Sequence, residues 1–328
     1  MIDFALTITD TGWLTTFQDL GRRDAERLGV PSGGAADQHS AAVANLLVGN
    51  TRDAVLIESM GGELAFVPER DVLVAVTGAP SRVTVGGADV VQWSPVLVPA
   101  GAEMRISETP FGMRVYAAVA GALETERFLG SAAPDARMGF TQQIARGSRI
   151  VLRSWFAGFP GATFPQALFR LPVPVPTFPA GPWAIDAVLG PDSARIRGIR
   201  ELIESSTYAV TDRSNHVGLR LNGPVLHPEG DDEIVSHGVP IGALEVPHAD
   251  ELIVLGRYRT LTAGYPIVGF ATRTALARLG QAGPGRELRF RWVERSAAAH
   301  AAATAEESLR VLETSVHSAF DALAPARL

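Results

Sequence analysis

The chain of 328 residues contains no cysteine and, because all 29 of its basic residues are arginine, no lysine. The missing cysteine excludes a thiol nucleophile, a disulfide and a thiolate zinc site. The missing lysine excludes a Schiff base, a complete G-x-x-x-x-G-K-[ST] phosphate loop, and covalent attachment of biotin or lipoate. Any catalysis by this chain therefore depends on carboxylates, amides, hydroxyls and arginines, with histidine a weaker candidate.

Long apolar runs and a basic leader are also missing. Val72–Val76 and Val115–Ala120 are among the longest apolar stretches, far below the ~20 residues that a membrane helix needs. The first ten residues carry Asp3 and Asp10 and show no secretory signal. The net charge of −6 and a pI of about 5.7 argue against a general nucleic-acid binder. We expect a soluble cytoplasmic protein with no nucleic-acid and no membrane partner.

Proline and glycine divide the chain. Seven of the 22 prolines lie between Pro160 and Pro182, in a segment that cannot form a central strand. In the segment from residue 296, Thr304 and Glu307 resemble a capping box, and apolar residues follow at helical spacing. We therefore predict a unit at 1–158, a connector at 159–182, a second unit at 183–295 and a helical tail at 296–328. The tail is expected to pack on its own chain or on a partner.

Short runs of β-branched residues separated by turn residues are the main local pattern in both units. The expected strands include 72–76, 83–85, 96–98, 114–119 and 149–152. Helices are expected at 37–48, where Asp37 is the N-cap and Gly49 the stop, and at 195–203 and 274–279. The pattern predicts a mainly β fold with a few helices, built from closed or nearly closed barrels.

Two groups of polar residues lie in expected loops, where functional sites usually occur. In the first group, Gln18, Asp19 and Arg22 could recognise a carboxylate or phosphate, and Gly33 and Gly34 could bring backbone N–H groups to an anion. Alternatively, Asp19 and Arg22 form an ion pair that braces a turn, and Asp37 only caps its helix. Residue type alone leaves both interpretations open.

The second group contains Ser214, Asn215, Arg220, Ser236 and Tyr265. Serine, asparagine and arginine side chains that converge from loops can bind a small polar substrate. The alternative is that Ser214 and Asn215 make turn hydrogen bonds and that Tyr265 belongs to a rigid packing corner. These two interpretations also remain open.

Motifs of several common enzyme classes are missing. Four of the seven histidines lie between His216 and His248, but their spacings of 11, 10 and 11 residues match no short metal-ligand motif. We therefore predict no metal site. The sequence has no G-x-S-x-G elbow and no G-x-G-x-x-G dinucleotide fingerprint.

A family resemblance runs through the same segments, in collinear order over about residues 1–295. Its motifs are T-F-Q-D-L-G-R (16–22), G-V-P (29–31), A-N-L-L-V-G-N (44–50), L-I-E (56–58), T-G-A (77–79), L-G-S (129–131), S-N-H-V-G-L-R-L-N-G-P (214–224), E-I-V-S-H-G-V-P-I-G (233–242), A-G-Y-P (263–266) and P-G-R-E-L-R-F (284–290). With these motifs the chain resembles the KipA family. That family is also called allophanate hydrolase subunit 2, or the biotin-dependent carboxyltransferase family, and it includes the C subunit of 5-oxoprolinase.

The resemblance implies two cyclophilin-like β-barrel units and a hetero-oligomeric complex. The expected partners are a KipI-like subunit (allophanate hydrolase subunit 1) and often a LamB/YcsF-like subunit. In the 5-oxoprolinase the subunits together open the lactam of 5-oxoproline to glutamate with ATP, so ATP is expected to be shared with partner subunits. In urea carboxylase, related regions transfer carboxylate from carboxybiotin to urea. Because this chain has no lysine, any biotin must be attached to another chain.

The motifs place candidate site residues, and residue chemistry suggests their roles. Asp19 is the candidate base, Arg22 and Arg220 would neutralise a substrate carboxylate or a transferring phosphoryl group, and Asn215 would polarise the amide oxygen. We predict a catalytic set and a substrate-binding set that face one pocket. The catalytic set is Asp19, Arg22 and Asn215, and the substrate-binding set is Gln18, Asp37, Glu58, Ser214, Arg220, Ser236 and Tyr265.

The chain departs from the family pattern at five notable positions. Gly33 stands where the family commonly has Ser, His216 where it has Arg, Glu245 where it has Gln, Tyr258 where it has Asp, and Thr260 where it has Gln. The leading hypothesis is a subunit of an ATP-dependent amide-hydrolysing complex. One alternative is a non-catalytic regulator that binds a KipI-like kinase inhibitor, which the losses at Tyr258 and Thr260 and the apolar-striped tail favour. The other is a carboxyltransferase component that acts on urea or a related amide.

Overall fold

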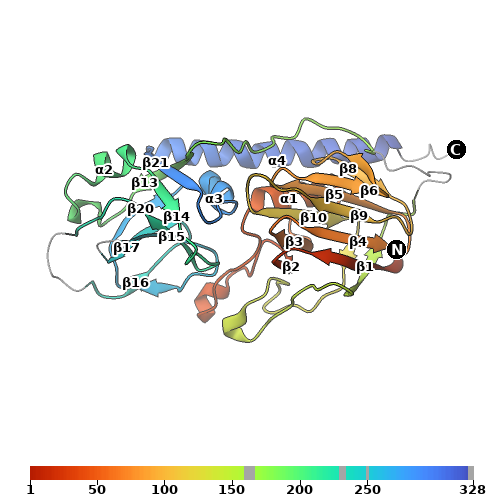
Figure 1. The fold of residues 1–328 in the computed structure, drawn as a ribbon, viewed down its shortest axis with the longest axis horizontal. Helices are drawn as coiled ribbons and strands as arrows, with labels where there is room; N and C mark the ends of the chain where they lie inside the picture. Colours follow the sequence, from red (N-terminus) through yellow and green to blue (C-terminus); the bar gives the residue numbers. More distant parts are fainter. Residues whose placement is uncertain (159–166, 229–233, 249–250, 324–328) are drawn as a thin grey trace. The chain divides into compact units, whose positions relative to one another are not determined.

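The computed structural model describes residues 1–158, 167–228, 234–248 and 251–323 (Figure 1). The chain forms two compact units, neither of which is continuous in sequence. Unit 1 contains Met1–Arg22, Asp37–Pro176 and Glu306–Leu328, and unit 2 contains Arg23–Ala36 and Thr177–Ala305. Residues 23–36 thus fold with unit 2, although residues on both sides of them fold with unit 1. The boundaries expected at 158, 182 and 295 remain a prediction about domains.

Two antiparallel β-sheets form the body of unit 1. In the described residues the larger sheet has the order β11 (Ala122–Leu123), β12 (Arg149–Ser154), β1 (Ile2–Thr11), β4 (Leu64–Pro68), β9 (Met104–Ser107), β6 (Arg82–Val85) and β7 (Ala88–Val90). The smaller has the order β2 (Leu14–Gln18), β3 (Leu56–Met60), β10 (Arg114–Val119), β5 (Val72–Gly78) and β8 (Pro95–Val98). The strands expected at 72–76, 83–85, 96–98, 114–119 and 149–152 are all present.

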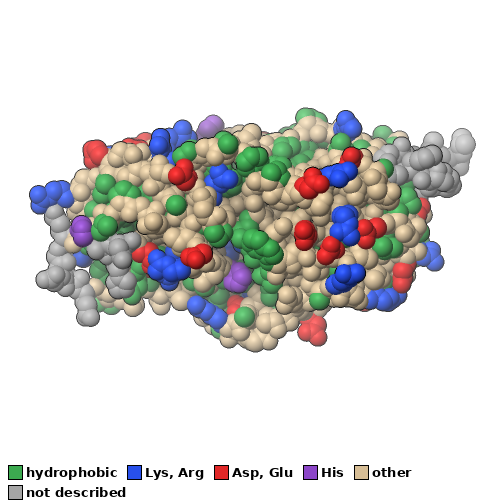
Figure 2. Space-filling model, viewed as in Figure 1, with side chains coloured by type: hydrophobic (Ala, Val, Ile, Leu, Met, Phe, Trp, Pro, Cys, Tyr) green, Lys and Arg blue, Asp and Glu red, His purple; other side chains and the backbone are tan. Residues whose placement is uncertain are grey.

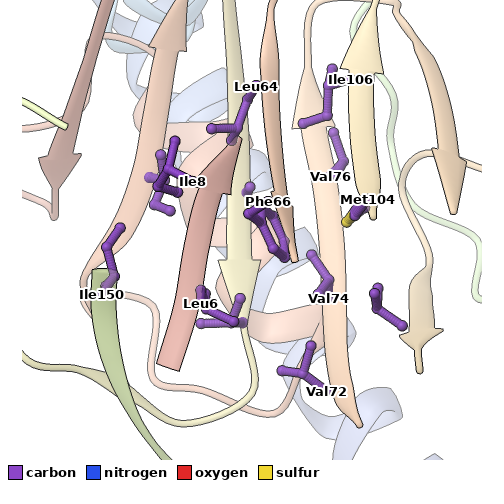
Figure 3. Close-up of a cluster of buried hydrophobic side chains, with 14 of the residues drawn as sticks. Leu6, Ile8, Leu64, Phe66, Val72, Val74, Val76, Met104, Ile106 and Ile150 are labelled. Atoms are coloured by element: carbon purple, nitrogen blue, oxygen red, sulfur yellow. The ribbon is translucent and has the colours of Figure 1, made fainter. Parts of the chain in front are cut away.

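The inner faces of these two sheets share one hydrophobic core (Figure 3). Alternate residues of each strand point into it, as the two-residue period of a strand requires: Leu6 and Ile8 from β1, and Val72, Val74 and Val76 from β5. The intervening residues of the smaller sheet lie on its other face. That second face carries the polar residues described below.

Helix α1 (Gln38–Leu47) packs on β5 and β10 of the smaller sheet (Figure 1). It begins after Asp37, whose carboxylate accepts a hydrogen bond from the backbone N–H of Ser40, and Gly49 follows its end with a φ of 76°. Eight of its ten residues are buried. The expected helix and its N-cap are therefore confirmed.

Unit 2 contains a closed barrel. Its strand order is β13 (Trp183–Leu189), β20 (Ile267–Ala271), β17 (Ala243–His248), β18 (Glu251–Leu255), β15 (Gly218–Asn222), β14 (Tyr208–Val210) and β21 (Glu287–Trp292). A two-stranded ribbon, β16 (His237–Gly238) with β19 (Thr262–Ala263), lies outside the barrel order. Helices α2 (Ile199–Ser205) and α3 (Arg273–Leu279) belong to this unit, as do the short 3-10 helices η1 (Ala25–Leu28) and η3 (Ser193–Arg195). The mainly β architecture with a few helices and a C-terminal helix is confirmed.

Helix α4 (Arg295–Leu323) starts nine residues before Thr304, so the expected capping box is wrong. Thr304 lies inside the helix and donates its hydroxyl to the carbonyl of His300, one turn back. The second half of α4 packs within unit 1, where Phe320 makes edge contacts with Trp155 and Phe169 at ring-centroid distances of 5.2 Å. Arg52 pairs with Glu306 at 2.5 Å and with Glu313 at 2.8 Å. The tail therefore packs on its own chain.

The proline-rich connector falls partly outside the described residues, which omit 159–166. Within 167–182 the backbone enters no strand, apart from an isolated bridge between Ala167 and Val96. The helix expected at 195–203 divides into η3 and α2, because Ile196 is extended and Gly198 has a φ of 66°.

Candidate functional site

A row of polar residues crosses the outer face of the smaller sheet in unit 1. Thr16 of β2 lies opposite Glu58 of β3, Glu58 lies opposite Tyr116 of β10, and Tyr116 lies opposite Thr77 of β5. Residues that face each other across neighbouring strands project on the same side of a sheet. All four side chains are buried. The fold thus builds a continuous polar strip from four separate segments of sequence.

The N-terminus of α1 is bonded to this strip. Asp37 donates its backbone N–H to the Tyr116 hydroxyl at 2.9 Å, and its carboxylate accepts the N–H of Ser40 at 3.0 Å and the Ser40 hydroxyl at 2.6 Å. Thr77 donates its hydroxyl to the Ser40 carbonyl at 2.7 Å. Burial raises the pKa of the Tyr116 phenol well above its usual range, and the Glu58 and Asp37 carboxylates raise it further. Tyr116 is therefore a neutral group at physiological pH.

Gln18 and Glu58, both predicted to bind substrate, belong to the same strip. The Gln18 Nε2 amide donates to the Thr16 hydroxyl at 3.1 Å, and the Glu58 carboxylate lies 3.5 Å from Nε of Arg114. The structure thus brings together Gln18, Glu58 and, through Tyr116, Asp37. Tyr116 and Arg114 were missed from the sequence because they lie in a strand that reads as a hydrophobic run.

Asp19 contacts a segment more than a hundred residues away. Its Oδ1 accepts hydrogen bonds from the Ser131 hydroxyl at 2.6 Å and the Gly21 N–H at 2.8 Å, and its Oδ2 accepts the Ala132 N–H at 2.8 Å. The residue is nearly fully buried. Both carboxylate oxygens of Asp19 are therefore occupied by donors from its own unit.

Arg22 is fully buried and lies beside Asp135, with Nη1 4.0 Å from the Asp135 Oδ2. Its Nη2 donates to the Ala133 carbonyl, and its guanidinium lies over the Phe128 ring, 5.3 Å from the ring centre. Among the described residues its Nε and Nη1 make no hydrogen bond. The expected brace is present, but its partner is Asp135; the described ion pairs do not join Asp19 to Arg22.

Ser214 and Asn215 shape a turn in unit 2. The Ser214 hydroxyl accepts the Arg220 N–H at 3.0 Å and donates to the Arg220 carbonyl at 3.3 Å. The Asn215 Oδ1 accepts the Val217 N–H at 2.8 Å. Of the two interpretations left open, the structure shows the turn hydrogen bonds. Because Asn215 is exposed and this bond uses only its oxygen, its Nδ2 amide is still a donor to a ligand.

Arg220 shares a carboxylate with a second arginine. Its Nη1 donates to one oxygen of Glu251 on the neighbouring strand β18, and Arg213 Nη2 lies 2.9 Å from the other oxygen. Two cations around one carboxylate leave a surplus of positive charge. Arg220 is partly exposed, so this surplus reaches solvent.

Ser236 and Tyr265 flank the β16–β19 ribbon. Ser236 directly precedes β16, Tyr265 follows β19 by two residues, and His237 pairs with Ala263 between them. Both side chains are exposed. The ribbon thus brings together two predicted substrate-binding residues that lie 29 positions apart.

Besides Glu251, two buried charged residues among the described residues of unit 2 were not in the predicted site. Glu245 of β17 lies between Ile253 and Ile267 on the neighbouring strands, and its Oε1 makes no hydrogen bond among the described residues. Burial raises the pKa of its carboxyl, and the charge of His237 opposes that rise. Arg259 donates from Nε to the Val239 carbonyl at 2.6 Å and from Nη2 to Glu26 at 3.0 Å. The sequence could have identified Arg259, because it is the arginine that this chain retains in the family's D-R-Q-T-T run.

Two of the departures from the family pattern contact each other. The His216 and Tyr258 rings pack edge to face with centroids 5.7 Å apart. An Arg and an Asp of the family pattern are thus replaced here by an aromatic pair. Gly33 has a φ of 60° and donates its N–H to the Arg257 carbonyl at 3.1 Å, in a backbone conformation that glycine adopts readily.

The candidate residues therefore form separate groups within their own units. Gln18, Asp19, Arg22, Asp37 and Glu58 belong to unit 1, and Ser214, Asn215, Arg220, Ser236 and Tyr265 belong to unit 2. That all of them face one pocket remains a prediction. Within the part of the chain that the structure describes, no cluster of three metal-ligating side chains occurs and no helix is long and apolar enough to cross a bilayer. On the face drawn in Figure 2, described side chains of both charge signs are interspersed.

Comparison with known proteins gives consistent matches. A family model described as "Carboxyltransferase domain, subdomain A and B" matches residues 28–292. The chain is 30% identical over 295 residues to the C subunit of 5-oxoprolinase from Escherichia coli (strain K12), with 87% of this chain and 90% of that one covered. It is 26% identical over 307 residues to urea amidolyase of Saccharomyces cerevisiae, where the match covers 87% of this chain and 16% of the relative.

Solved structures share the fold. The crystal structure of TTHA0988 is 29% identical with a TM-score of 0.73, over 88% of this chain and 55% of that chain. The urea amidolyase of Kluyveromyces lactis has a TM-score of 0.84 at 22% identity, over 94% of this chain and 20% of that chain. The chain thus spans about half the length of the first of these proteins and a fifth of the second.

Proposed function

Because the chain belongs to the family of carboxyltransferase domains with subdomains A and B, we propose that it is a subunit of an ATP-dependent amide-hydrolysing complex, equivalent to the C subunit of 5-oxoprolinase. In the proposed reaction the lactam of 5-oxoproline is opened to glutamate while ATP is hydrolysed to ADP and phosphate. The partners are a KipI-like subunit and a LamB/YcsF-like subunit.

The match to the E. coli protein supports this proposal most strongly. It extends over about nine-tenths of both chains, so it is not confined to one shared segment. The corresponding 5-oxoprolinase protein of Haemophilus influenzae (strain ATCC 51907 / DSM 11121 / KW20 / Rd) is 24% identical over 90% of this chain and 93% of its own.

Exposure decides which predicted residues we assign to substrate. Asn215, Ser236 and Tyr265 are exposed and Arg220 is partly exposed, so each can contact a ligand. In our proposal Asn215 donates from Nδ2 to the amide oxygen, and Arg220 attracts a substrate carboxylate. Asp37 caps α1 and bonds Tyr116 of the buried polar strip, to which Gln18 and Glu58 also belong.

In our proposal Asp19 and Arg22 have structural roles, although their residue types suggest catalysis. Both are buried and already bonded to the 131–135 segment. The general base is then expected on another residue or on a partner subunit.

The nucleotide is assigned to a shared or partner site. The chain has no lysine for a phosphate loop, and the arginine of its first motif, Arg22, is enclosed beside Asp135, so it does not fit a triphosphate. When bound, ATP would supply the free energy that activates the amide. Biotin, in a carboxyltransferase reaction, would likewise be presented by another chain.

Transfer of carboxylate to urea or a related amide is the second candidate. The family description and the urea amidolyase match favour it. The regulator hypothesis has lost one support, because the tail packs on its own chain, whereas the departures at Tyr258 and Thr260 still favour it.

The test is to co-express the chain with its KipI-like and LamB/YcsF-like partners and to measure phosphate and glutamate release with 5-oxoproline, and phosphate release with urea. Turnover with 5-oxoproline supports the proposal. Turnover only with urea, and only when a biotin carrier is added, supports the carboxyltransferase. A purified complex that turns over neither amide contradicts both.

Asn215→Asp isolates the proposed amide donor. Aspartate keeps the oxygen that accepts the Val217 N–H but removes Nδ2, so the turn is retained while turnover falls about 10²-fold. Asp212→Ala, an exposed change in the same loop, is the matched control and leaves turnover unchanged. Equal turnover by Asn215→Asp and the unaltered chain would rule out the assigned role.

A further inference from the structure

A surface lobe of unit 1, residues 127–140, presents two apolar side chains to solvent. Leu129 is 42% exposed and Met138 is 45% exposed. Phe128 and Phe140 join the two halves of the lobe, with ring centroids 5.8 Å apart. In Figure 1 this stretch, coloured yellow to yellow-green, loops outward from the sheets of its unit. Neither Leu129 nor Met138 belongs to the core of the unit.

The backbone at Leu129 is in an unfavourable conformation. Phe128 and Ser131 exchange backbone hydrogen bonds of 2.8 and 3.2 Å around a two-residue turn in which Leu129 has a φ of 49° and Gly130 a φ of 82°. Both central residues of a type I′ turn need positive φ, which glycine and asparagine tolerate and leucine does not. Because Leu129 is exposed as well, internal packing does not explain its presence.

The buried side chains of Asp19 and Arg22 contact the base of this lobe. Asp19 bonds Ser131 and Ala132 directly after the turn. Arg22 lies 4.0 Å from the Asp135 Oδ2, while the Asp135 Oδ1 accepts the N–H groups of Arg137 and Met138 at 3.1 and 3.2 Å. Both apolar tips are therefore fixed by buried charged groups. Strained conformations that the surroundings enforce in this way gather at functional positions.

We infer that the 127–140 lobe is a contact surface for another protein subunit, with Leu129 as its anchor and Asp19 as a positioning residue. Protruding tips insert into a partner, whereas small-molecule sites are concave. The exposed charges nearby are Arg127, Arg137 and Glu126, and Nη1 of Arg127 also lies 4.0 Å from Oδ2 of buried Asp19. Because Arg127 and Arg137 are cations, the partner surface that fits is an apolar pocket bordered by carboxylates. The E. coli relative is named as a subunit, and in the S. cerevisiae relative the matching region is part of a much longer chain.

The identity of that partner rests on the proposed function, so the probe is the purified KipI-like subunit, titrated by calorimetry. Leu129→Gly removes the anchor and also relieves the backbone strain. We expect its melting temperature to equal or exceed that of the unaltered chain, while Kd for the KipI-like subunit rises at least tenfold. Glu108→Gly is the matched control, because Glu108 is exposed and has a φ of 52°. It should leave Kd unchanged.

The outcomes distinguish a failure of the proposed contact surface from a failure of the proposed function. A Kd for Leu129→Gly within twofold of that of the unaltered chain overturns the lobe as the contact and leaves the proposed function standing. Failure of the unaltered chain to bind the KipI-like subunit overturns both. Asp19→Asn tests the positioning role. Alone it should raise Kd for the KipI-like subunit, but combined with Leu129→Gly it should raise Kd no further than Leu129→Gly does alone. Additive weakening would show that Asp19 does not act through the turn.

Discussion

At the scale of single residues, the first motif of the chain makes buried intramolecular contacts with residues whose types suggest catalysis. Asp19 and Arg22 carry the residue types of an active site, yet both bind a segment 111 to 113 positions further along the chain. The sequence identified both segments as family motifs but could not show that they touch, because contact between distant segments is decided by tertiary folding. The turn hydrogen bonds of Ser214 and Asn215 were one of the two alternatives that the sequence left open.

Arg22→Ala is expected to lower the free energy of unfolding by about 3–5 kcal/mol, because it leaves the Asp135 carboxylate buried without its counter-ion. Chemical denaturation measures this. The double variant Arg22→Ala/Asp135→Ala should be less destabilised than the sum of the two single variants. Arg70→Ala, an exposed arginine of unit 1, is the control. Loss of turnover in Arg22→Ala would therefore not by itself identify a catalytic arginine.

Glu245 should make stability depend on pH. Its pKa is raised in the folded state, so its contribution to stability is complete below the unfolded pKa of about 4.3 and is lost as the pH rises through the folded pKa. Glu245→Gln should therefore be more stable than the unaltered chain at neutral pH, with the difference disappearing near pH 4. Melting temperatures between pH 4 and 7 measure this. Exposed Glu287→Gln should show no such change, and parallel profiles for Glu245→Gln and the unaltered chain would contradict the account.

At the scale of elements, local patterns predicted much of what forms. Strands β5, β8 and β10 and helix α1 appear where β-branched runs and a capping aspartate indicated them. The start of α4 was wrong because Thr304 followed by Glu307 looks the same in sequence at a helix start and inside a helix. The division of the helix expected at 195–203 depends on the backbone of Ile196 and Gly198, which periodicity does not report.

Neighbouring residues of α4 test its packing. Leu312 is buried and Val311 is 56% exposed, on different faces of the same turn. Leu312→Ala should therefore cost about 2–4 kcal/mol of unfolding free energy, whereas Val311→Ala should change it by less than about 0.5 kcal/mol. Denaturant titration of both variants measures the difference. Equal and small effects would mean that α4 does not pack on unit 1 in solution.

At the scale of the whole molecule, the two units interleave in sequence. Residues 23–36 leave unit 1 and fold with unit 2, where Glu26 pairs with Arg259 and Gly33 bonds Arg257. Of the four passages between units, proline content indicated the one at 176/177, and nothing in the composition of residues 23–36 marks the two at its ends; the fourth lies within α4 at 305/306. The first motif and the helix that follows it are thus tied to unit 2 by the segment between them.

The absence of lysine and cysteine acts at this scale as well. A chain with neither cannot attach biotin or lipoate or complete a G-x-x-x-x-G-K-[ST] phosphate loop, so in our proposal the nucleotide site is shared with other subunits and any biotin is carried by another chain. The proposed function is therefore that of a complex, in which this chain would be a subunit that ATP-dependent amide turnover requires.

The most direct test is the initial rate of phosphate release from ATP by the purified complex, measured against 5-oxoproline concentration with and without this chain. The account predicts a saturable rate that requires the chain and yields one glutamate for each phosphate released. A rate that is independent of 5-oxoproline, or that is unchanged when this chain is omitted, would contradict it.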